Sequence, residues 1–307
     1  MRAFIFPGQG SQAVGMGAAL AEASRAARDV FDEVDQALGQ NLFRLMREGP
    51  DDDLKLTENA QAAIMAHSIA VLRTLGVELP DVARFVAGHS LGEYSALCAA
   101  GSFDLATTAK LLKLRGQAMQ RAVPVGEGAM AALLGADLAV AQKIADAAAQ
   151  GEICTVANDN DPSQVVISGA KAAIDRAIAM AKDMGAKRAV PLPVSAPFHC
   201  PLMQPAAEAM RDALSYVVVE PPAVPVFANV TAQPETDPDT IRNQLIEQVT
   251  GMVRWRESVA NMTEAGVDEF VEIGGKVLGA MVKRIAPDAQ VTSVVTIEDV
   301  ETLAKVI

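Results

Sequence analysis

The sequence contains few of the residues on which disulfide and metal chemistry depend. Its 307 residues include only three cysteines and three histidines. Cys98, Cys154 and Cys200 are far apart, odd in number and form no CxxC pair, so we expect neither a disulfide framework nor a metal site. Buried, reduced thiols in a cytoplasmic protein are the simplest interpretation.

Basic character, aromatic residues and long apolar runs are also scarce. The net charge of −12 and an aromatic content of 4% argue against nucleic acid as the main partner. No run of about 18 apolar residues predicts a membrane span, and the apolar stretch at the N-terminus is too short to predict a signal peptide. Half of the residues are nevertheless apolar, so the chain can bury a large core.

Short apolar segments alternate with longer segments of helical periodicity, which predicts an α/β fold with a mainly parallel sheet. One helix is expected over about Met16–Leu38, and another from Asp104 to about Arg121. Between residues 126 and 195 the predicted order is β-α-β-β-α-β, the ferredoxin-like arrangement. We therefore expect a small ferredoxin-like domain, 126–195, inserted between the two parts of a large α/β domain, 1–125 and 196–307.

The strongest local motif is Gly88-His89-Ser90-Leu91-Gly92, between a predicted strand and a predicted helix. A serine between two glycines at such a turn is typical of the nucleophile elbow of α/β hydrolases, so we describe the large domain as hydrolase-like. The alternative is a glycine-rich turn whose serine only caps a helix.

A serine nucleophile needs a base, most often a histidine. His89 adjoins Ser90 and should point elsewhere, and His67 lies among apolar residues of a helix, which suggests a structural role. His199 remains, in a proline-fixed loop that leaves the small domain. Elimination therefore makes His199 the candidate base, at a junction of domains where clefts are common.

Arg115 lies on a mostly apolar face of the helix that follows Asp104, together with Leu112 and Met119. A buried guanidinium needs an anion. The pattern alone leaves two candidates, a structural Asp or Glu and a substrate carboxylate.

Together these segments resemble the malonyl-CoA:acyl-carrier-protein transacylases and the acyltransferase domains of fatty-acid and polyketide synthases. The resemblance covers nearly the whole chain and is carried by these motifs: Phe6-Pro7-Gly8-Gln9-Gly10-Ser11-Gln12, Gly88-His89-Ser90-Leu91-Gly92-Glu93, Arg115, Asn158 with Pro162 and Gln164, Val166-Ile167-Ser168-Gly169, the segment Pro197–Met203, and Gln248 before Val253-Arg254-Trp255.

The resemblance implies a role for each matching residue. Ser90 would attack the malonyl thioester, with His199 as base and the backbone carbonyl of Gln248 holding His199. The backbone amides of Gln9 and Leu91 would form the oxyanion hole, and Arg115 would pair with the malonyl carboxylate. The remaining candidates for the substrate site are Met119, Phe198, Asn158 and His89. An aromatic residue at Phe198 favours malonyl over methylmalonyl.

The implied reaction moves malonyl from malonyl-CoA to the phosphopantetheine thiol of acyl carrier protein, supplying extender units for fatty acid synthesis. Thioester is exchanged for oxyester and back, so no cofactor is expected. We expect a free-standing, monomeric, cytoplasmic enzyme. Its alternatives are a polyketide acyltransferase using malonyl or methylmalonyl, a serine thioesterase or esterase, a fragment of a synthase, and an inactive carrier-binding relative.

Carrier proteins are generally acidic, and this chain is acidic too. Docking therefore requires a local basic patch near the cleft. Seven cations are candidates, from the Arg115 helix and the small domain: Lys110, Lys113, Lys171, Arg176, Lys182, Lys187 and Arg188.

Overall fold

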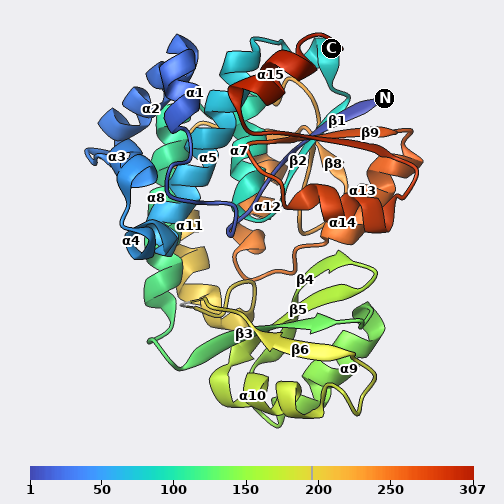
Figure 1. Cartoon of the computed structure of the whole chain (residues 1–307). Helices are drawn as coiled ribbons and strands as arrows, with labels where there is room; N and C mark the ends of the chain where they lie inside the picture. Colours follow the sequence, from blue (N-terminus) through green and yellow to red (C-terminus); the bar gives the residue numbers. More distant parts are fainter. Residues whose placement is uncertain (195) are drawn as a thin grey trace.

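The chain folds into two lobes, each built on its own β-sheet (Figure 1). The computed structural model describes residues 1–194 and 196–307. The larger lobe contains a six-stranded sheet, and the smaller lobe, below it in Figure 1, contains a four-stranded sheet.

The six-stranded sheet is mainly parallel, which confirms the predicted α/β fold with a mainly parallel sheet. Its strands, from one edge to the other, are β10 (Gln290–Val294), β9 (Glu269–Ile273), β1 (Arg2–Phe6), β2 (Phe85–Gly88), β7 (Val226–Phe227) and β8 (Pro234–Glu235). β8 pairs antiparallel with β7, and the other pairs are parallel. Along β1, Phe4 and Phe6 face one core whereas Ala3 and Ile5 face another, because successive side chains point to opposite faces.

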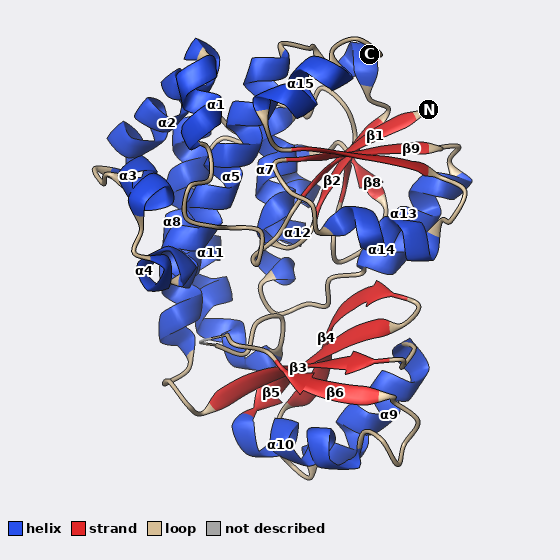
Figure 2. Cartoon of the chain, in the orientation of Figure 1, coloured by secondary structure: helices blue, strands red, loops and turns tan. Residues whose placement is uncertain are grey.

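Helices cover both faces of this sheet (Figure 2). The core of Phe4 and Phe6 includes side chains from α1 (Ala18–Ala23), α2 (Arg25–Leu38), α3 (Leu42–Glu48), α4 (Asp51–Lys55), α5 (Thr57–Leu75), α6 (Leu79–Val82), α7 (Leu91–Ala99), α8 (Leu105–Ala122), η1 (Pro201–Met203), α11 (Gln204–Ser215), α12 (Pro238–Gln248) and α15 (Ile297–Leu303). The core of Ala3 and Ile5 includes side chains from α13 (Trp255–Glu264) and α14 (Leu278–Ile285).

The smaller lobe contains the six elements expected between residues 126 and 195, in the expected order. They are β3 (Gly128–Leu134), α9 (Leu138–Ala149), β4 (Cys154–Asp161), β5 (Gln164–Ala170), α10 (Lys171–Met180) and β6 (Arg188–Pro191). The strands lie antiparallel in the order β4-β5-β3-β6. Leu133, Ile144, Ile167 and Ile174 are in its separate core.

Buried carboxylates connect the two lobes. Asp159 Oδ2 lies 2.7 Å from Arg256 Nη2 of α13, and Asp161 Oδ2 lies 2.8 Å from Arg284 Nη2 of α14. Both aspartates are on β4 and both are buried, whereas the arginines are partly exposed. The small lobe is therefore held in place by charge-assisted hydrogen bonds as well as by the chain connections.

The prediction of a single helix over Met16–Leu38 is wrong, because the segment contains two helices, α1 and α2, that are separated at Ser24. Ser24 is extended, with φ −125° and ψ 123°, and its Oγ caps α2. The apolar periodicity continues across this break because α1 and α2 both bury their apolar faces in the same core.

In the part of the chain that the structure describes, no helix combines the length and apolar character that crossing a membrane requires.

Candidate active site

The expected turn around Ser90 connects β2 to α7. Ser90 has φ 54° and ψ −111°, an uncommon conformation for a residue with a side chain. Both flanking glycines are required by close contacts. A Cβ on Gly88 would lie 1.9 Å from the backbone of Gly92, and a Cβ on Gly92 would lie 2.3 Å from the carbonyl oxygen of Phe6. The geometry is that of a sharp strand-to-helix elbow with Ser90 at its tip.

Asn229, which follows β7, stabilises this elbow. Its Oδ1 accepts a 2.7 Å hydrogen bond from the backbone N–H of Ser90, and its Nδ2 donates a 2.7 Å bond to the carbonyl oxygen of Gly88. Asn229 is buried. One amide thus satisfies both backbone groups of a strained turn, a role that the sequence analysis missed because the partners are 139 and 141 residues apart.

His199 lies beside the serine. Its Nε2 is 2.7 Å from Ser90 Oγ, and its Nδ1 is 2.8 Å from the backbone carbonyl oxygen of Gln248. A carbonyl oxygen only accepts, so Nδ1 carries the proton and Nε2 presents its lone pair to the serine hydroxyl. Burial, followed by the positive charge of Arg115, lowers the pKa of His199 to about 3. The imidazole is therefore neutral at physiological pH and can accept a proton.

Arg115 is almost completely buried in α8, at 1% exposure. Its Nη2 donates hydrogen bonds to Ser90 Oγ at 3.2 Å and to Gln248 Oε1 at 2.8 Å. Its Nη1 donates to Gln61 Oε1 at 2.8 Å. Within residues 1–194 and 196–307, its hydrogen-bond acceptors are thus uncharged oxygens. Of the two anions that the sequence left open, a structural Asp or Glu in direct contact with Arg115 is not present among these residues.

A buried carboxylate does lie one residue further away. Glu93 of α7 accepts a 2.7 Å hydrogen bond from Gln248 Nε2, the other end of the amide that accepts from Arg115. Burial raises the pKa of Glu93 to about 7, although the hydrogen bonds from Gln248 and Asn229 and the charge of Arg115 oppose this shift. The sequence motif included Glu93, but nothing in the sequence indicated its contact with Gln248.

A cleft of about 500 Å³ contains nine of the ten predicted site residues. They are Gln9, His89, Ser90, Leu91, Arg115, Met119, Asn158, Phe198 and His199. The tenth, Gln248, lies behind His199 and Arg115. His89 points away from the serine, as expected, with Nε2 2.8 Å from Asn160 Oδ1. The sequence analysis missed Gln61 and Lys55, which also line the cleft.

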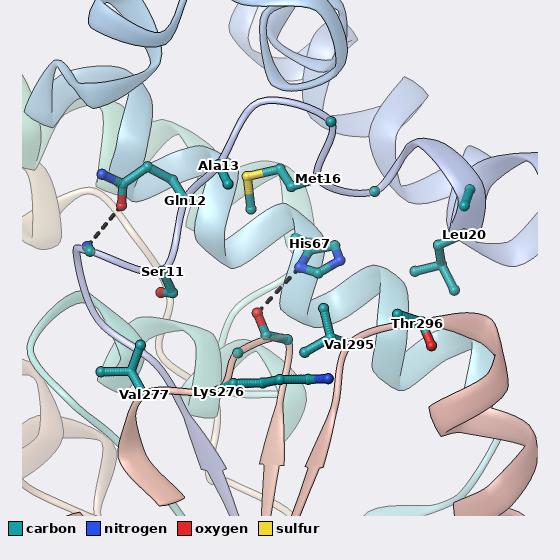
Figure 3. A pocket seen from close by; sticks show the side chains of 16 residues that line it. Ser11, Gln12, Ala13, Met16, Leu20, His67, Lys276, Val277, Val295 and Thr296 are labelled. Atoms are coloured by element: carbon teal, nitrogen blue, oxygen red, sulfur yellow. Dashed lines mark hydrogen bonds between the residues drawn. The ribbon is translucent and has the colours of Figure 1, made fainter. Parts of the chain in front are cut away.

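His67 lies in a different cavity, of about 470 Å³, between the N-terminal loop and the segment after β9 (Figure 3). Its Nδ1 lies 3.3 Å from the carbonyl oxygen of Gly274, and the ring is buried in α5. Burial lowers its pKa. These contacts agree with the structural role expected for His67.

The seven candidate docking cations are not equally available. Lys110, Lys171, Lys182, Lys187 and Arg188 are exposed. Arg176 instead donates to the carbonyl oxygens of Ala148 and Ala149, and Lys113 donates to Asn59 Oδ1. None of the seven lines the cleft, whereas Lys55 does.

Among the described residues, no group of three or more His, Cys, Asp or Glu side chains is arranged to hold a metal ion.

Comparisons with known proteins identify the family of the chain. The acyl transferase domain family matches residues 3–297. The malonyl CoA-acyl carrier protein transacylase of Haemophilus influenzae is 45% identical over 294 residues, which cover 95% of this chain and 94% of that protein. The Bacillus subtilis protein of the same name is 46% identical over 288 residues, covering 92% and 90%.

Solved structures are similar over the whole chain. The acyl-carrier-protein-S-malonyltransferase of Bartonella henselae is 51% identical, with a TM-score of 0.97 and coverage of 99% of this chain and 98% of that one. A malonyl-transacylase solved in complex with a type II PKS acyl-carrier protein is 40% identical, with a TM-score of 0.95 and 99% coverage of both chains. The chain therefore belongs to the acyltransferase family, and within it to the malonyl-CoA:acyl-carrier-protein transacylases.

Proposed function

We propose that the protein transfers malonyl from malonyl-CoA to the phosphopantetheine thiol of an acyl carrier protein. Ser90 Oγ attacks the thioester carbon while its proton passes to His199 Nε2. The C–S bond then breaks, and this proton leaves with the CoA thiol. The carrier thiol next gives its proton to His199 and attacks the serine ester, and Ser90 leaves with the proton restored. Because the two substrates use one site in turn, ping-pong kinetics are expected.

One observation carries this proposal: Ser90 Oγ lies within hydrogen-bond distance of both His199 Nε2 and Arg115 Nη2. A nucleophile, a neutral base and a buried cation therefore meet at one atom. The cation suits an acyl group that ends in a carboxylate, because charge-assisted hydrogen bonds are strong where water is excluded. A hydrolase of uncharged esters would gain nothing from this cation.

The other candidate residues have supporting roles in this proposal. The backbone N–H groups of Gln9 and Leu91 bind the oxyanion; Leu91 begins α7, where backbone N–H groups have no partner within the helix. The carbonyl of Gln248 replaces the carboxylate of a Ser-His-Asp triad. Four further residues of the cleft contact the substrate: Met119, Phe198, Asn158 and His89. The bulk of Phe198 favours malonyl over branched acyl groups.

We also propose a domain assignment for the two lobes. We assign a hydrolase-like large domain to residues 1–125 and 196–307 and a ferredoxin-like domain to residues 126–195. The strand order β4-β5-β3-β6 and the two helices α9 and α10 support the second assignment. The elbow between β2 and α7 supports the first.

Cofactors and partners follow from the chemistry. The mechanism uses one thioester, malonyl-CoA, and one thiol, that of the carrier protein, and requires no cofactor or metal. We propose acyl carrier protein as a transient partner that docks through exposed cations of the small lobe and the Arg115 helix. A monomer in the cytoplasm, without nucleic-acid or membrane partners, stays the expectation.

A polyketide pathway is the second candidate for the destination of the malonyl group. The solved complex of a similar malonyl-transacylase with a type II PKS acyl-carrier protein favours it. The chemistry at Ser90 would be the same, and the carrier protein would differ. Methylmalonyl transfer and thioester hydrolysis are the two alternative reactions that the experiment must distinguish from malonyl transfer.

The test is the mass of the intact protein after brief exposure to malonyl-CoA, followed by peptide mapping. Addition of one malonyl group on Ser90, its absence in Ser90→Ala, and its removal by carrier protein support the proposal. Methylmalonyl-CoA and acetyl-CoA are the comparison substrates. Continued release of free CoA beyond one equivalent per protein, without carrier protein, would instead identify a hydrolase.

A further inference from the structure

A relay of hydrogen bonds connects Glu93 to Arg115 through one amide. Glu93 Oε2 accepts from Gln248 Nε2 at 2.7 Å and from the backbone N–H of Asn229 at 3.1 Å. Gln248 Oε1 accepts from Arg115 Nη2 at 2.8 Å. All four residues are buried, so these contacts are shielded from competing water. The relay runs from α7 through α12 to α8 and ends 3.2 Å from Ser90 Oγ.

The two ends of the relay determine the orientation of the amide between them. An ionised carboxylate only accepts hydrogen bonds, and a guanidinium only donates them. Gln248 satisfies both neighbours when Nε2 faces Glu93 and Oε1 faces Arg115. A flipped amide would place an NH₂ group against the guanidinium. Glu93 and the carbonyl oxygen of Ser90, which accepts from Nε2 at 3.0 Å, therefore favour the orientation in which Arg115 meets Oε1. In this way Glu93 helps to aim the guanidinium at the serine.

Charge provides a second connection between these residues. Arg115 is a buried cation that no carboxylate of the described residues contacts directly, and Glu93 is the buried carboxylate behind it. When an acyl group brings its own carboxylate to Arg115, two anions share one cation. The negative charge of Glu93 must then weaken the attraction between Arg115 and the incoming carboxylate.

We propose that Glu93 is a positioning residue for the carboxylate-binding function of Arg115. Acting through Gln248, it aims the guanidinium, and by its charge it prevents carboxylate-bearing acyl groups from binding too tightly for turnover. This inference rests on the proposed function. Burial raises the pKa of Glu93 to about 7, so this charge is present chiefly above neutral pH.

Two substitutions separate orientation from charge. In Glu93→Gln the side-chain oxygen can still accept from Gln248 and Asn229, so the relay persists and only the charge is lost. We expect the KM for malonyl-CoA to fall about tenfold in this variant, with the KM for acetyl-CoA within about twofold of the wild-type value. In Glu93→Ala the charge and the relay are both lost, so the KM for malonyl-CoA relative to that for acetyl-CoA should be higher than in Glu93→Gln.

A matched control is available in the same lobe. Glu272 is also completely buried, and its carboxylate accepts from the backbone N–H groups of Val277, Leu278 and Gly279, outside the relay. Glu272→Gln removes a buried charge and should leave the ratio of the two KM values unchanged, even where it lowers stability. Thermal unfolding of every variant identifies those that do not fold.

The experiment follows Ser90 acylation of the full chain by the two thioesters. A malonyl KM that is unchanged or raised in Glu93→Gln, or the same KM ratio in Glu93→Ala as in Glu93→Gln, would overturn the inference. The wild-type protein tests the proposed function separately, because a wild type that malonyl-CoA does not acylate contradicts that function whatever the variants do.

Discussion

The Nη2 atom of Arg115 lies 3.2 Å from Ser90 Oγ, the oxygen that also lies 2.7 Å from His199 Nε2. An acyl group joined to Ser90 therefore starts next to the guanidinium, and a carboxylate only a short distance along the acyl chain can reach it. This relationship suits a three-carbon dicarboxylate such as malonyl. The cation, Arg115, can be tested by substitution, and the base, His199, by the pH profile of the rate.

Replacing Arg115 by alanine should damage malonyl transfer selectively. Loss of a charge-assisted contact with the substrate carboxylate is expected to lower kcat/KM for malonyl-CoA by about 100-fold. Acylation of Ser90 by acetyl-CoA, which has no carboxylate to bind, should change far less. Stopped-flow or quenched-flow mass spectrometry with both thioesters makes the comparison. Unaltered malonyl kinetics would show that Arg115 is structural.

The pKa of His199 predicts an unusual pH profile. Burial and Arg115 lower it to about 3, from an ordinary value of 6.5, so the neutral base persists in acid. The rate of acylation by acetyl-CoA should stay flat from pH 8 to about pH 5. The measurement is best made in Glu93→Gln, where titration of Glu93 cannot overlap. An acidic limb with a midpoint near 6.5 would contradict the depressed pKa.

Glu93 predicts a pH dependence of stability with the opposite sign from that of most carboxylates. The native state holds its proton up to about pH 7, whereas the ordinary pKa is 4.5. Between these values the native state binds more protons than the unfolded chain, so the free energy of unfolding falls as the pH rises. The full effect is at most about 3 kcal/mol.

Urea unfolding of wild type and Glu93→Gln at pH 5 and pH 8 tests this sign. Wild type should gain stability relative to the variant at the lower pH. The contribution of His199, whose depressed pKa makes stability rise with pH, is common to both proteins and cancels in the difference. A difference that is the same at both pH values would count against a raised pKa for Glu93.

Carrier docking should depend on exposed cations of the small lobe. Lys187→Glu combined with Arg188→Glu is expected to raise the KM for carrier protein about 3- to 10-fold at low salt, and less at high salt. Acylation by malonyl-CoA should not change. Lys305→Glu, an exposed lysine near the C-terminus, is the matched control. Carrier kinetics that are equal in the two variants would remove these residues from the docking surface.

The sequence predicted those parts of the site that local pattern encodes. The elbow was predictable because two glycines and a serine occupy five adjacent residues, and Arg115 because a cation on an apolar helix face stands out. His199 was found by elimination among three histidines. The partners Gln61, Glu93 and Asn229 were not found, because their roles arise from contacts across the fold. The break at Ser24 was missed because the apolar periodicity continues past it.

The pairing of β4 with α13 and α14 has a consequence for substrate entry. Swinging the small lobe away from the large one would leave the carboxylates of Asp159 and Asp161 without their arginines, at a cost of several kcal/mol. We therefore expect the gap between Ser90 and the small lobe to be set largely when the chain folds. Thioesters would then enter a preformed slot, and side chains at its mouth would control admission more than a hinge does.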